Sequence, residues 1–69
     1  MHREAAYAIL SMSTAYYNLG DLVKAEELGK EGLFIREKTL GPDHELTKKA
    51  RDELDIIFKS KSRGGGALK

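Results

Sequence analysis

The chain has 69 residues, which limits it to one small domain that buries only about 60% of the surface its unfolded chain exposes. It has no cysteine, which excludes disulfides and cysteine-based metal sites. Charged residues make up 33% of the chain but balance to a net charge of +1, which argues against an obligate nucleic-acid-binding protein.

The first predicted helix covers residues 3–19. Bulky apolar residues recur there at steps of three and four, which predicts a buried stripe: Ile9, Met12, Tyr16 and Leu19. A second, partly apolar face carries Tyr7, Leu10, Thr14 and Tyr17. A helix with two such faces packs between two neighbours or lines a binding surface.

A turn at residues 18–21 separates this helix from a second one, predicted over residues 21–39. Gly20 suits the left-handed end of a helix, and the Asp21 carboxylate can cap the next one. Glu26 and Lys30 are four residues apart, in the order that favours a surface ion pair. Gly41 and Pro42 end the second helix. A turn this short predicts that the first two helices pack antiparallel.

Two glycines lie inside the second predicted helix. Gly29 and Gly32 each cost about 0.8–1 kcal/mol relative to alanine in an exposed helix, and they share one face. We expect another helix to approach closely at that face, with a functional hinge or partner groove as the alternative.

The third predicted helix covers residues 43–60 and lies roughly parallel to the first. Asp43 or His44 can cap its start. Its apolar stripe is Leu46, Ala50, Leu54, Ile57 and Phe58, and its other faces are charged. Residues 61–69 contain three basic residues, no acidic residue and three consecutive glycines, which predicts a flexible tail.

The sequence contains no catalytic signature. Asp43, His44 and Glu45 are potential metal ligands, but neighbouring side chains diverge, so helix capping is the favoured interpretation. Hydrolase, zinc-protease and phosphate-binding glycine motifs are absent. We therefore expect a non-catalytic protein without a metal or cofactor.

The apolar runs of the chain are too short for a membrane span, and residues 1–4 lack the layout of a signal peptide. We expect a cytoplasmic location, with the cytoskeleton, the cilium or the nucleus as alternatives.

Several short segments together resemble a tetratricopeptide repeat (TPR). They are Ala15-Tyr16, Gly20-Asp21, Ala25-Glu26, residues 35–38 (IREK) and residues 40–44 (LGPDH). The resemblance is closest to the long-helix repeats of kinesin light chain, with a period of about 42 residues. A shift by this period superposes Met12 on Leu54 and Tyr16 on Phe58.

The resemblance implies an all-α fold: an antiparallel helix hairpin plus one further helix, as a segment of a right-handed superhelical solenoid. Residues 1–60 would form one full repeat and a capping helix at the C-terminal end of a longer array. The chain departs from the family at Gly29, Gly32 and Glu45, where a large residue, alanine and proline are usual, and at Leu22, which replaces an aromatic residue.

First helices of such repeats line a concave groove that holds peptides. Carried over by position, the partner-binding residues would be Tyr7, Leu10, Thr14, Tyr17, Asn18, Lys49, Asp52, Ile56 and Lys59. This mixed set suits a peptide segment. The alternative is that these residues contact neighbouring repeats.

The expected function is that of a protein–protein interaction scaffold that binds a partner protein or peptide. The alternatives are a structural cap or docking element of an assembly, an accessory segment of an enzyme, and electrostatic binding through the basic tail. Since about three repeats are needed for stability, we also expect residues 5–17 to dock onto upstream repeats or another protein. Isolated residues 1–63 should then show weak helicity or concentration-dependent association.

Overall fold

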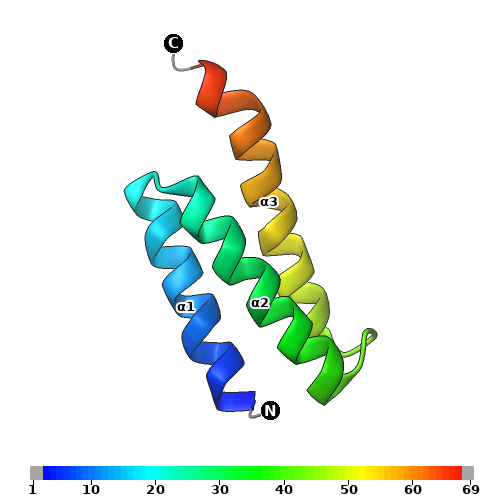
Figure 1. Cartoon of the computed structure of the whole chain (residues 1–69). Coiled ribbons are helices and arrows are strands. Elements are labelled where there is room, and N and C mark those ends of the chain that lie inside the picture. Colours follow the sequence, from blue (N-terminus) through cyan, green and yellow to red (C-terminus); the bar gives the residue numbers. More distant parts are fainter. Residues whose placement is uncertain (1–2, 68–69) are drawn as a thin grey trace.

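The computed structural model describes residues 3–67, and in this range the chain consists of three α-helices and no strand. They are α1 (Arg3–Leu19), α2 (Leu22–Leu40) and α3 (Glu45–Ala67). Figure 1 shows α2 in the middle, antiparallel to both neighbours, so that α3 runs roughly parallel to α1. The predicted all-α class and helix directions are confirmed. None of the described helices is both long and apolar enough to cross a membrane.

The turn between α1 and α2 is formed by backbone and capping bonds of residues 16–24. Gly20 has φ +89°, where a side chain would be strained. The Gly20 N–H donates to the Tyr17 carbonyl (3.0 Å) and the Asp21 N–H to the Tyr16 carbonyl (2.9 Å), which is the Schellman pattern. The Asp21 carboxylate accepts from the Lys24 N–H at 3.1 Å. Both predictions for Gly20 and Asp21 are therefore confirmed.

The second turn begins at Gly41, which has φ +94° and donates its N–H to the Glu37 carbonyl (3.1 Å). Helix α3 begins at Glu45, two residues later than predicted. His44 rather than Asp43 is the capping residue, because its Nδ1 accepts from the Leu46 N–H at 3.0 Å. The imidazole therefore has a structural role at the start of α3.

Helices α1 and α2 approach closely where α2 carries glycine. A Cβ added to Gly32 would lie 2.4 Å from Leu10 Cγ, well inside van der Waals contact. The Ser13 hydroxyl donates to the Ala25 carbonyl at 2.7 Å, which satisfies a buried polar group across the same interface. The predicted close helix–helix approach at the glycines is confirmed.

The buried face of α1 differs from the predicted one. Met12 and Leu19 are 47% and 78% exposed, so the predicted stripe through Ile9, Met12, Tyr16 and Leu19 is wrong as a buried face. The buried positions are Ala6, Leu10 and Ser13. Small residues and one leucine fit against the glycines of α2, whereas the bulkier stripe cannot approach as closely. The periodicity of large residues therefore identified a face that this hairpin leaves open.

Helix α3 also packs on α2, and it meets α1 over the face that carries Gly29. Ala50, Leu54 and Ile57 are buried, while the predicted stripe residues Leu46 and Phe58 remain 43% and 41% exposed. The Thr47 hydroxyl donates to the Arg36 carbonyl (3.3 Å), and the Arg36 guanidinium donates to the Leu46 carbonyl (3.2 Å). These reciprocal bonds anchor the first turn of α3 to the last turns of α2.

Helix α3 continues to Ala67, beyond the predicted end at Ser60. Two contacts join α3 to the other helices where this extension begins: Ser60 Oγ lies 3.2 Å from the Tyr17 hydroxyl, and the Lys61 ammonium binds the Glu26 carboxylate. Figure 1 shows the C-terminal half of α3 extending past the α1–α2 turn. The flexibility assigned to residues 61–69 stays a prediction, and residues 68–69 lie outside the described part of the chain.

Glu26 links α2 to this C-terminal part of α3. Its carboxylate binds Lys61 of α3 and Lys30 of α2, the latter at 3.1 Å as predicted. The pKa of Glu26 lies below its ordinary value of 4.5, chiefly because of the hydrogen bond with Lys61 and, to a smaller extent, because of the hydrogen bond with Lys30. Burial acts in the opposite direction.

The lowered pKa of Glu26 predicts a specific loss of stability in acid. Because the folded-state pKa is the lower one, the contribution is complete above 4.5 and disappears as the pH falls through the folded-state value. We expect the melting temperature of Glu26→Gln to decline less than that of the unaltered chain on acidification below 4.5. Glu27→Gln, at an exposed position, is the control. If acidification lowers the melting temperatures of the unaltered chain and of Glu26→Gln by the same amount, the role assigned to the Glu26 carboxylate is wrong.

Candidate functional site

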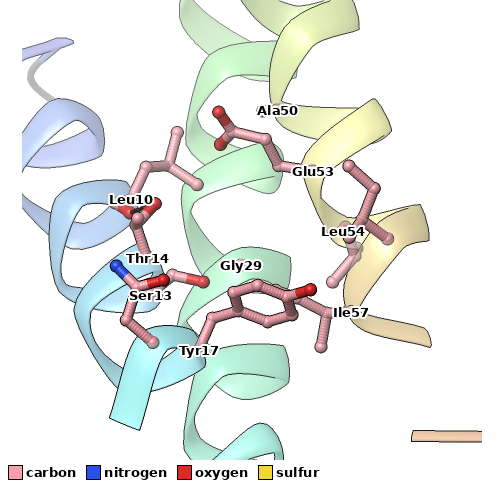
Figure 2. Close-up of a pocket in the computed structure, with 11 residues that line it drawn as sticks. Leu10, Ser13, Thr14, Tyr17, Gly29, Ala50, Glu53, Leu54 and Ile57 are labelled. Atoms are coloured by element: carbon pink, nitrogen blue, oxygen red, sulfur yellow. Dashed lines mark hydrogen bonds between the residues drawn. The ribbon is translucent and has the colours of Figure 1, made fainter. Parts of the chain in front are cut away.

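A groove lies between α1 and α3, on the side of α2 that carries Gly29. Its walls come from Leu10, Thr14 and Tyr17 of α1 and from Leu54 and Ile57 of α3, and its volume is about 220 Å³. Figure 2 shows these side chains converging from the two outer helices over α2. The groove exists because α1 and α3 both pack on α2 and not on one another along this length.

Gly29 determines how close the walls of the groove come to its floor. A Cβ at this position would lie 3.0 Å from Leu54 Cδ1 and 3.4 Å from the Ser13 hydroxyl. The absence of a side chain therefore lets both outer helices settle against α2 at the same level. The Tyr17–Ser60 contact closes the end of the groove nearest the α1–α2 turn.

A second depression continues the groove toward the start of α3. It shares Leu10, Thr14 and Glu53 with the first and adds Tyr7 and Lys49. Its floor includes Arg36, whose guanidinium is held by the Leu46 carbonyl. The two depressions together form a continuous surface along α1 and α3.

Seven of the nine predicted partner-binding residues line this continuous surface. They are Tyr7, Leu10, Thr14, Tyr17, Asn18, Lys49 and Ile56. Leu10 has a structural role as well, because it is only 6% exposed and fills the space beside Gly32.

The other two predicted partner-binding residues, Asp52 and Lys59, line neither depression. The Lys59 ammonium instead pairs with the Asp55 carboxylate at 3.3 Å on the outer surface of α3. The structure therefore brings the α1 residues together with only part of the α3 set.

In the 220 Å³ part, sequence reasoning missed five lining residues, Ser13, Ala50, Glu53, Leu54 and Ile57, and it gave a partner groove at Gly29 as an alternative. Glu53 follows Lys49 by four residues, so the helical step from Lys49 was the signal that could have found it. The carried-over set used Asp52 instead, which lies about 100° away around the helix.

The groove is apolar and carries few charges. Among the lining residues of the 220 Å³ part, Glu53 is the only charged one, and α1 contributes no charge between Ala5 and Gly20. Lys49 borders the adjoining depression. Such a surface suits an apolar ligand that bears a small number of polar groups.

Among the described residues, no cluster of three or more His, Asp or Glu side chains is arranged to hold a metal ion. A comparison of the chain with protein-family models, curated protein sequences and solved structures finds no match in any of the three.

Proposed function

We propose that the chain is a TPR-type segment that acts as a non-catalytic protein–protein interaction scaffold, and that it holds a peptide of its partner in the groove between α1 and α3. The observation that carries the proposal is this groove, apolar and open between two roughly parallel helices. Parallel first helices that line one face are the arrangement expected of tandem helical repeats.

The pattern of burial on α1 and α3 supports the repeat assignment. Helix α3 contacts α2 through Thr47, Ala50, Leu54, Ile57 and Lys61. A shift of 42 residues, the period of the resembled repeat, maps these onto five α1 residues. This set, which we call the outer face of α1, is Ala5, Ala8, Met12, Ala15 and Leu19, all exposed. In a repeat array, this face would pack on the second helix of the preceding repeat.

Two adjacent residues of α1 provide the test of the groove. Thr14 lines both depressions, and Ala15 lies on the outer face. Thr14→Trp should weaken binding of short capped peptides roughly tenfold or more, because the indole fills the groove. Ala15→Trp is the matched control and should leave this binding unchanged. Fluorescence anisotropy measures both, with circular dichroism to confirm unchanged helicity.

A chain that binds no peptide in the groove but associates through the outer face of α1 would favour a second candidate function, a structural cap or docking element. The exposed outer face of α1 is the observation behind this alternative. If no peptide binds in the groove and Ala15→Trp alone disrupts association with other chains, the scaffold proposal is wrong and the docking role replaces it.

A further inference from the structure

The Glu53 carboxylate has an unusual position for a charged group on this surface. It is partly buried, lines both depressions, and extends from α3 toward α1 across the apolar walls (Figure 2). Among the side chains that the structure describes, none donates a hydrogen bond to it or forms an ion pair with it. The carboxylates that do form ion pairs there are Glu26, Glu37 and Asp55. A partly desolvated carboxylate gains from a cation that enters the groove.

The hydroxyl groups beside Glu53 already use their protons. The Ser13 hydroxyl donates to the Ala25 carbonyl, and the Thr14 hydroxyl donates to the Leu10 carbonyl at 3.2 Å. Their remaining capacity is to accept hydrogen bonds. Glu53, Ser13 and Thr14 therefore all offer acceptors, and the ligand group that matches them is a donor without acceptors.

We infer that the groove, if it binds peptides as proposed above, selects a segment with a cationic side chain between apolar ones, and that Glu53 receives the cation. A lysine ammonium offers three donors and no acceptor, which fits the surplus of acceptors. Its aliphatic stem lies along Leu54 and Ile57, which form the apolar wall below the carboxylate. The apolar neighbours of the lysine occupy the rest of the groove.

The test uses three pools of short capped peptides that share randomised apolar flanks and differ at one central position. That position is lysine, glutamine or glutamate. The unaltered chain should bind the lysine pool roughly tenfold more tightly than the glutamine pool, the size expected for one charge-assisted hydrogen bond at a partly buried site. The glutamate pool should bind most weakly, because two carboxylates would meet in the groove.

Variants at Glu53 assign this preference to one carboxylate. Glu53→Gln keeps the shape of the side chain and should remove the lysine preference, while Glu53→Lys should transfer the preference to the glutamate pool. Glu31→Gln makes the same change of charge at an exposed position on α2, outside the groove lining, and should retain the lysine preference.

The possible outcomes separate this inference from the proposed function. Equal binding of all three pools, blocked by Thr14→Trp, would overturn the role of Glu53 and leave the peptide groove standing. A lysine preference that persists in Glu53→Gln would also overturn it. Absence of binding by every pool would reject the peptide-binding groove itself.

Discussion

Replacing Gly32 with leucine should destabilise the fold by roughly 1–3 kcal/mol through overpacking. A Cβ at this position would already lie 2.4 Å from Leu10 Cγ and 2.5 Å from Leu10 Cδ2, so a larger side chain must push α1 away from α2. Because natural domains of this size are marginally stable, such a loss is a large fraction of the total free energy of unfolding. Thermal and urea unfolding followed by circular dichroism measure it.

Gly32→Ala combined with Leu10→Ala tests whether the clash is the cause. Alanine stabilises a helix by about 1 kcal/mol relative to glycine through helix propensity. The net effect of Gly32→Ala on stability therefore depends on whether the Leu10 side chain clashes with the added Cβ. We expect Gly32→Ala to lower the melting temperature when Leu10 is present and to raise it in the Leu10→Ala background. A stabilising osmolyte can keep the Leu10→Ala background folded.

Gly29→Ala is the matched control for Gly32→Ala. Its Cβ would meet the terminal Cδ1 of Leu54 at 3.0 Å, and a terminal methyl group can move aside more easily than the branch point of a buried leucine. Its effect should therefore be smaller. An increase in melting temperature for Gly32→Ala with Leu10 intact would show that the two helices do not need this close approach.

The second large effect concerns the outer face of α1. Met12 and Leu19 are 47% and 78% exposed there. Val23, at the start of α2, is also 59% exposed. An apolar face of this kind on a domain with a small core favours association. Isolated residues 1–63 should therefore show weak helicity or concentration-dependent association in sedimentation and circular dichroism.

Charged substitutions locate the surface that causes this association. Met12→Lys and Leu19→Lys should convert the associated form to monomer, because each places a charge in the apolar contact. Ile56→Lys, at a groove residue that is 50% exposed, should leave association intact. A well-folded monomer of residues 1–63 with a sharp thermal transition at micromolar concentration would contradict the requirement for a docking partner.

The end of α1 and both ends of α2 could be predicted from sequence to within one residue, because local chemistry decides them. Gly20 and Asp21 form a cap through backbone and carboxylate bonds within a few residues, and Gly41 with Pro42 ends α2 independently of tertiary contacts. The end of α3 could not be predicted in this way. The contact of its C-terminal part with α2, from Lys61 to Glu26, joins residues 35 positions apart in sequence.

The buried face of α1 was predicted wrongly because periodicity gives weight to large residues. Met12 and Leu19 are strong signals in the sequence, but Gly29 and Gly32 make the small residues of α1 the better packing partners. All five predicted α1 positions line the groove or its continuation, whereas Glu53 of α3 was missed. One helical position separates it from Asp52, and only the packing of α3 on α2 decides which of the two faces α1.

Nuclear magnetic resonance of the isotope-labelled chain, titrated with the lysine-centred peptide pool, shows whether the surface between α1 and α3 binds a peptide. We expect the amide shifts to change at Thr14, Tyr17 and Ile57, which line the groove, and to stay fixed at Met12 and Ala15 on the outer face. Shifts confined to Met12 and Ala15, or no shifts at saturating peptide, would contradict this expectation.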